Sequence, residues 1–201
     1  EGIRRDMVEL QNIPSSRISL FGATQMGYVE RFLQKKDAKA SPLPFPYVYF
    51  GCAIGVPQLV PVEIEIVKKV AERLQIRHPD WKLVVRPYPV LRDWSPYEAL
   101  KSIPNLVLDD GFRSAKATSI AVGEDALLDK FVTIHHSKAF MHLGTTLGIE
   151  ASYTQAPSLL LDLKEYARPE QNLDVHHFVH QYQNDKYLNL EGFPNVIRTI
   201  A

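Results

Sequence analysis

The chain carries the sequence AFMHLGTTLGIEA at residues 139–151. Its first five residues are apolar except for His142, and a short apolar run of this kind is typical of a buried strand. A turn of small residues follows and begins a helix. Another apolar run, SLLLD at 158–162, is typical of a second strand. A strand, a helix and a strand in this order predict a parallel βαβ unit with a right-handed crossover.

The same alternation extends from this unit toward the N-terminus. We expect further strands at 47–51, 81–86 and 106–108, and helices at 62–76, 97–102 and 123–137. The sequence therefore predicts an α/β fold: a doubly wound, mostly parallel Rossmann-like sheet with helices on both faces.

This predicted domain covers residues 47–201, and its tail after residue 162 is irregular apart from one helix expected near 173–183. Residues 1–46 form an N-terminal interdomain segment, with helices expected near 5–11 and 25–34 and a strand at 17–21. The segment ends in a proline-rich linker at 35–46, where prolines remove backbone donors and favour extended structure.

The composition excludes several classes of protein. Acidic and basic residues balance at 23 each, so no net charge attracts nucleic acid or an anionic membrane. No apolar run approaches the roughly 20 residues that span a bilayer. The lone Cys52 excludes an internal disulfide and fits a reducing compartment, where it is expected to be a small buried apolar side chain. We therefore expect a cytoplasmic protein.

The turn between the strand at 139–143 and the following helix is the strongest candidate for a ligand site. Gly144, Thr145 and Thr146 place unpaired backbone N–H groups at the positive end of the helix dipole, where a phosphate can bind. Glu150, one turn into the helix, could accept hydrogen bonds from ribose hydroxyls. Alternatively, one of the threonines is an ordinary N-cap and Glu150 only complements the helix dipole.

Glycine and aspartate residues follow two other predicted strands. Gly51 and Gly55 either allow a ligand to approach the backbone closely or only form a turn. Their spacing does not match the G-x-G-x-x-G dinucleotide motif. Asp110, in the sequence Asp109-Asp110-Gly111, is a candidate binding residue, but Asp and Gly also favour turns for local reasons.

Three more candidates have side chains suited to a nucleotide. Arg86 offers a planar fork for phosphate, and Tyr88, between two prolines, could stack on a base; the alternative is a solvated surface loop. His142 ends a strand just before the small-residue turn and either faces a ligand or is packed. His176 and His180 share a helical spacing that can bind zinc, but no further ligand is identifiable, so no metal is expected.

Several of these motifs together resemble the C-terminal, donor-binding domain of GT-B-fold glycosyltransferases, which is half of that fold. They also resemble the related UDP-N-acetylglucosamine 2-epimerase and glycerophosphotransferase groups. The similarity covers about residues 8–162, and Tyr88 stands where those proteins usually have histidine. The motifs are NIPSSRISLFG at 12–22, LVVRPYP at 83–89, the short strand at 105–110, GTTLGIEA at 144–151 and APS at 156–158.

The resemblance implies a domain that binds a nucleotide-sugar donor for a glycosyltransferase of surface polysaccharide or glycolipid synthesis. The helix after Gly144 would face the donor's phosphates, with Thr145, Thr146 and Arg86 stabilising the leaving diphosphate without an obligatory metal or other cofactor. Glu150 would contact ribose. An acceptor-binding domain is expected before residue 1, so no catalytic residue is assigned and this chain alone is not expected to turn over.

Two alternatives remain open from the sequence: a sugar-nucleotide epimerase of the same architecture, and a non-catalytic α/β module that binds a nucleotide or a protein. The expected partners are a nucleotide sugar and the N-terminal domain of the same protein, with no nucleic acid. If the acceptor is held at a membrane, the full-length protein is expected to be peripherally associated with that membrane.

Overall fold

The chain is organised around a six-stranded sheet in which all paired strands are parallel. The computed structural model describes residues 2–19, 26–35, 40–53, 57–89, 93–110, 124–163, 174, 177 and 196–200. The strand order is β3-β2-β1-β4-β5-β6. The strands are β1 (Tyr47–Gly51), β2 (Lys82–Arg86), β3 (Leu106–Leu108), β4 (Phe140–His142), β5 (Ser158–Asp162) and β6 (Val196–Ile200).

The strand order reverses between β1 and β4, because the chain leaves β1 in one direction to build β2 and β3 and then returns to add β4 on the other side. In open α/β sheets ligands bind at such a reversal, beyond the carboxyl ends of the strands. Gly51, the last residue of β1, is in register with Arg86 of β2 and with His142 of β4. The carboxyl ends of these three strands therefore lie side by side, on the side of the sheet where a ligand is expected to bind.

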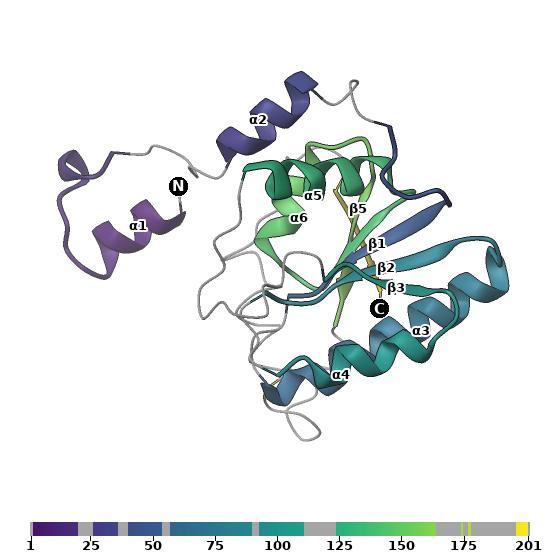
Figure 1. The fold of residues 1–201 in the computed structure, drawn as a ribbon. Helices are drawn as coiled ribbons and strands as arrows, with labels where there is room; N and C mark the ends of the chain where they lie inside the picture. The colour runs from purple at the N-terminus through teal and green to yellow at the C-terminus, as the bar shows by residue number, and fades with distance from the viewer. Residues whose placement is uncertain are drawn as a thin grey trace.

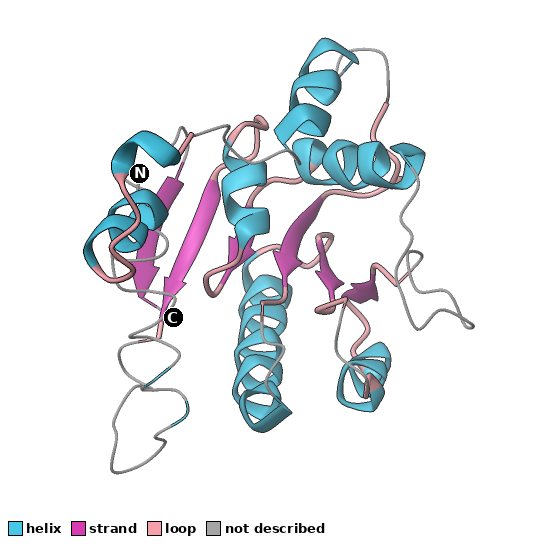
Figure 2. Cartoon of the chain, turned by 90° about the vertical axis from the view of Figure 1, so that its left-hand side faces the viewer, coloured by secondary structure: helices cyan, strands magenta, loops and turns pink. Residues whose placement is uncertain are grey.

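Helices cover both faces of the sheet (Figures 1 and 2). On one face lie α3 (Val60–Arg77) and α4 (Ser95–Glu98), which continues into the 3-10 helix η4 (Ala99–Ser102). Alternate strand residues point toward them, including Val48, Phe50, Leu83 and Val85, and α3 adds Ile64, Val67, Ala71 and Leu74. Burial of these apolar side chains provides the main stabilisation of this layer.

The opposite face carries α5 (Glu124–His136) and α6 (Thr146–Ser152). Tyr47 and Tyr49 of β1 and Phe140 of β4 pack there against Ile134 of α5 and Ala151 of α6. Tyr47 and Tyr49 alternate in sequence with the residues that face α3, because successive side chains of a strand point to opposite faces. The predicted doubly wound α/β fold is thus confirmed.

The N-terminal segment contributes helix α2 (Met26–Lys35), which packs on the outer side of α5. Val29 and Phe32 of α2 form a small core with Leu128, Phe131 and Val132 of α5. Part of the predicted interdomain segment 1–46 is therefore packed against the sheet domain. Helix α1 (Gly2–Glu9) and the 3-10 helix η1 (Ser15–Arg17) lie away from the sheet (Figure 1).

Two expectations for the ends of the chain, and one strand that was not expected, can be compared with the structure. The strand expected at 17–21 is wrong over its described part, because Ser15–Arg17 is helical and Ile18 and Ser19 pair with no strand. The sequence did not predict β6, which pairs with β5. The helix expected at 173–183 lies outside the described residues except for Asp174 and His177. Among the described helices, none has the length and apolar character needed to cross a membrane.

Candidate functional site

The loop between β4 and α6 is a tight turn beside the reversal of strand order. Gly144 has φ of 117°, a conformation that side-chain-bearing residues rarely adopt, which explains glycine at this position. Thr145 is the N-cap of α6: its backbone is extended, and its Oγ1 accepts a hydrogen bond from Leu147 N–H at 3.3 Å. The capping role that the sequence left open is therefore present for Thr145, whereas the Thr146 side chain is exposed.

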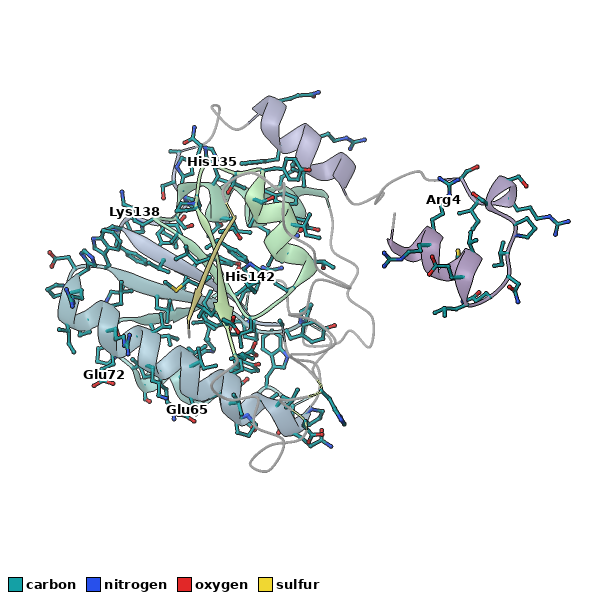
Figure 3. All side chains as sticks on the ribbon, turned by 180° about the vertical axis from the view of Figure 1, so that it is seen from behind. Arg4, Glu65, Glu72, His135, Lys138 and His142 are labelled. Atoms are coloured by element: carbon teal, nitrogen blue, oxygen red, sulfur yellow. The ribbon has the colours of Figure 1, made fainter. Side chains whose placement is uncertain are left out.

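His142 lies completely inside the fold beneath this loop (Figure 3). Its Nδ1 accepts a hydrogen bond from Gly144 N–H at 3.3 Å, and its Nε2 is 3.3 Å from Ser158 Oγ. The ring stacks on Phe140 with centroids 5.5 Å apart. Burial lowers the pKa of His142 from 6.5 to about 3, so the imidazole is neutral at physiological pH. Of the two alternatives from the sequence, the structure has the packed histidine.

Two glycines of this region are explained by close packing. A Cβ on Gly148 would lie 2.6 Å from His142 Nε2 and closer still to Cε1. A Cβ on Gly51 would lie 2.6 Å from Phe140 Cζ and 3.3 Å from Leu147 Cδ2. The sequence left open whether Gly51 allows a ligand to approach or forms a turn. In the structure Gly51 ends β1, and its lack of a side chain makes room for the ring of Phe140.

Arg86 is held by a polar cluster at the ends of β1, β2 and β3. Its Nη1 donates to Asp109 Oδ2 at 2.8 Å, and the hydroxyl of Tyr49 donates to the same oxygen. Burial raises the pKa of Tyr49 well above its ordinary value, and the charge of Asp109 raises it further. Burial alone would lower the pKa of Arg86, but Tyr49 and Asp109 outweigh it, so the pKa is raised and the guanidinium stays charged.

Glu150 joins α6 to α5. Its Oε2 accepts from Lys130 Nζ at 2.8 Å, and the two side chains are only 10% and 11% exposed, respectively. Lys130 Nζ also lies 4.5 Å from the centroid of the Phe131 ring. A ribose hydroxyl that bonded Glu150 would therefore have to share the carboxylate with Lys130.

Two of the remaining sequence candidates, Asp110 and Tyr88, follow the strands β3 and β2. Asp110 pairs with Lys101 at 3.0 Å on the exposed surface, and Tyr88 is partly exposed. Gly55 lies outside the described residues. In the part of the chain that the structure describes, no three His, Cys, Asp or Glu side chains gather as metal ligands.

Sequence reasoning missed a buried polar cluster on the α3 side of the same edge. Glu63, fully buried in the first turn of α3, accepts from Ala53 N–H at 2.8 Å through Oε1 and from the Tyr97 hydroxyl through Oε2. Burial, and next to it the Glu63 carboxylate, raises the pKa of Cys52 well above its ordinary value. Such a thiol is unreactive. A signal was present, because Glu63 shares the helical spacing of the buried residues Val60, Ile64 and Val67.

The structure thus brings together Gly51, Arg86, His142 and the loop 144–146 around the point where the strand order reverses. Two polar clusters lie near this point, one on each face of the sheet. Tyr49, Arg86 and Asp109 form the cluster on the α5/α6 face, and Cys52, Glu63 and Tyr97 form the cluster on the α3/α4 face. Small residues and polar groups therefore lie at the carboxyl ends of these strands, where doubly wound sheets bind ligands.

Two solved structures are similar to the chain over part of their length. One is UDP-GlcNAc 2-epimerase from Neisseria meningitidis bound to UDP-GlcNAc, at 15% identity and a TM-score of 0.43, covering 96% of this chain and 54% of that one. The other is Thermosulfurimonas dismutans KpsC, a beta Kdo 2,7 transferase, at 13% identity and a TM-score of 0.36, covering 79% of this chain and 46% of that one.

The chain therefore spans about half the length of these two proteins. No protein-family model matches it, and no curated protein matches it significantly. The first of the two structures is an epimerase of the group that the sequence motifs resemble.

Proposed function

We propose that this chain is a nucleotide-sugar-binding domain of a glycosyltransferase-type enzyme, and that the donor binds where the strand order reverses between β1 and β4. The single observation that carries the proposal is the geometry of this edge. In the six-stranded parallel sheet, of order β3-β2-β1-β4-β5-β6, the strand order reverses between β1 and β4. The loop formed by Gly144, Thr145 and Thr146 follows β4 and therefore lies beside this point. Dinucleotides and mononucleotides bind doubly wound sheets at this point.

In this proposal the diphosphate of the donor lies on the β4–α6 loop. Thr146, the first residue of α6, is exposed and supplies a hydroxyl at this loop. Thr145 acts indirectly, since its hydroxyl caps α6. Arg86 Nη1 is bonded to Asp109, so a phosphate contact through that nitrogen would require this bond to be exchanged.

The ordered sequence motifs support the same proposal, because the loop at 144–151 and the Arg86 loop are the segments that resemble the donor site of GT-B-fold enzymes. Transfer of the sugar would require an acceptor and a catalytic base outside this domain. The proposed role of this chain is to bind the donor and to stabilise negative charge on the departing diphosphate with preorganised donors.

The test is calorimetric titration of the chain with UDP, CDP, CMP, GDP and ADP, without and with magnesium. Thr146→Ala should weaken binding of the preferred nucleotide by about tenfold, the equivalent of about 1.4 kcal/mol. The matched control is Thr133→Ala, since Thr133 lies on α5 and its hydroxyl donates to Asp129 O within the same helix. The control should bind as the wild type does.

Each outcome has a defined meaning. Saturable binding of one nucleoside diphosphate that Thr146→Ala weakens supports the donor site. If neither Thr146→Ala nor Thr133→Ala changes the affinity, the nucleotide binds at a different site. The absence of binding by all five nucleotides would contradict the proposal and leave the protein-binding module. Conversion of a bound nucleotide sugar to its epimer would favour the epimerase.

A further inference from the structure

His142 and Gly144 are joined by a hydrogen bond that determines the protonation of the ring. Gly144 N–H donates to Nδ1, so Nδ1 carries no proton and the proton of the neutral ring is on Nε2. Nε2 then donates to Ser158 Oγ at 3.3 Å, and Ser158 Oγ donates to Gly148 O at 3.5 Å. These bonds run in one direction, from the loop through the ring to the backbone of α6.

The position of the ring leaves it little freedom. His142 is fully buried, Phe140 stacks on one side, and Gly148 of α6 leaves space for the ring edge only because it has no side chain. Nδ1 is therefore presented to the loop from a fixed place. Gly144, in contrast, belongs to the residue type with the widest choice of backbone conformations.

We propose that His142 is the positioning residue of the β4–α6 loop: through Nδ1 it holds Gly144 in the conformation that presents Thr146 to a diphosphate. The diphosphate part of this inference rests on the proposed function above. His142 itself does not touch the ligand, because it has no exposed surface. It acts through a single backbone N–H, two residues further along the chain.

Two substitutions separate this role from simple packing. In His142→Asn the amide oxygen can take the place of Nδ1 and accept from Gly144 N–H. In His142→Gln the longer amide reaches the place of Nε2 and can bond Ser158 Oγ, but it leaves Gly144 N–H without its acceptor. Both variants lose the ring, so they share the packing defect and differ in which hydrogen bond survives.

Amide hydrogen exchange of Gly144, followed by NMR in the full chain, is the direct readout. We expect Gly144 N–H to exchange at a similar rate in the wild type and in His142→Asn, and at least about tenfold faster in His142→Gln. Ser158→Ala, which removes only the partner of Nε2, should leave this rate close to that of the wild type. Equal exchange rates in the Asn and Gln variants would overturn the positioning role.

Calorimetry with UDP, or with whichever of the five nucleotides the wild type binds, extends the test to the ligand. The dissociation constant should stay within about threefold in His142→Asn and rise at least about tenfold in His142→Gln. Equal weakening in both would show that His142 acts by packing alone. If the wild type binds no nucleotide, the proposed function fails. The hydrogen-exchange rate of Gly144 N–H then still shows whether His142 holds the conformation of the loop.

A measurement on the wild type covers the case in which His142→Gln does not fold. The ring ¹⁵N chemical shifts distinguish the two neutral tautomers of histidine. The inference requires the Nε2–H tautomer, in which Nδ1 is free to accept from Gly144 N–H. A proton on Nδ1 would overturn it.

Discussion

The imidazole of His142 occupies the space that a side chain on residue 148 would need. A Cβ at residue 148 would lie 2.6 Å from Nε2 of the ring, whereas ordinary carbon contacts are about 3.5–4.0 Å. The ring cannot retreat, because Phe140 stacks on it and β4 is paired on both sides.

Gly148→Ala should therefore destabilise the protein by about 2 kcal/mol, although alanine is the better helix former, because overpacking outweighs propensity. In a His142→Asn background, where the ring edge is gone, the added methyl group should cost about 1 kcal/mol less. Urea unfolding of the four chains measures this coupling. Additive effects would show that the two residues do not compete for the same space.

The burial of His142 also makes stability depend on pH. Its pKa is about 3 in the folded chain, against an ordinary value of 6.5. Between these values the unfolded chain binds a proton that the folded chain excludes, so stability is lost as the pH falls from 6.5 toward 3. The contribution is complete above pH 6.5.

Relative to His142→Asn, the wild type should lose about 1.4 kcal/mol of unfolding free energy per pH unit inside this interval. Carboxylates common to both chains cancel in the difference. Urea unfolding of both chains at pH 7.5, 6 and 5 checks the expectation. Parallel pH profiles would show that His142 can be protonated within the folded chain.

Helices α5 and α6 are connected by a largely buried ion pair. Lys130 and Glu150 are 2.8 Å apart and about one-tenth exposed. A pair of this kind adds little net stability compared with apolar side chains, but removal of one partner leaves a charge in a poorly solvated place. The pair thus links α6, which follows the candidate loop, directly to α5.

Lys130→Met should destabilise the chain by about 1–3 kcal/mol, and the double variant with Glu150→Gln should cost less than the sum of the single changes. The control is the exposed pair Lys69–Glu65 on α3, also at 2.8 Å but with side chains more than half exposed. There, Lys69→Met should cost about 0.5 kcal/mol or less. Equal effects at both pairs, measured by urea unfolding, would contradict the importance of burial.

The arrangement of the whole molecule places α2, which precedes the proline-rich linker, on the sheet domain that follows it. Phe32 is almost completely buried and contacts the rings of Phe131 and His135, with centroids 5.7 and 5.3 Å away. Helix α2 thus forms a further layer outside α5, on the face of the sheet that carries α5 and α6 (Figure 1).

Phe32→Ala should reduce the free energy of unfolding by about 3 kcal/mol, since a buried aromatic ring is lost and a cavity remains. Leu10→Ala, at a residue that is 78% exposed near the end of α1, should change it by about 0.5 kcal/mol or less. Urea unfolding compares the two. If Phe32→Ala is as mild as the control, α2 does not unfold cooperatively with the sheet domain.

The alternation of strands and helices could be predicted from the sequence because it depends on local patterns. Apolar residues repeat at the helical spacing in α3 and as short runs in β1, β2, β4 and β5, and prolines and glycines mark where these elements end. The candidate loop was found for the same reason, since a strand, a small-residue turn and a helix adjoin within residues 139–151.

Local patterns failed where the partner is distant. The strand β6 is recognisable only through its pairing with β5, and Glu63 is a buried acceptor only because Tyr97 and Ala53 meet it in three dimensions. The pairing of Arg86 with Asp109 could not be predicted either, because this bond joins residues 23 positions apart.

Sequence alone therefore determined the fold class and the position of the candidate loop, since periodicity, turn residues and right-handed crossovers act over short stretches of chain. The contacts of each polar side chain at the carboxyl ends of the strands became visible only in the folded chain. His142 is packed rather than exposed, Glu150 is paired with Lys130, and Gly51 makes room for Phe140. Such roles depend on which side chains meet across the sheet, and these contacts exist only once the strands are paired and the helices are packed on them.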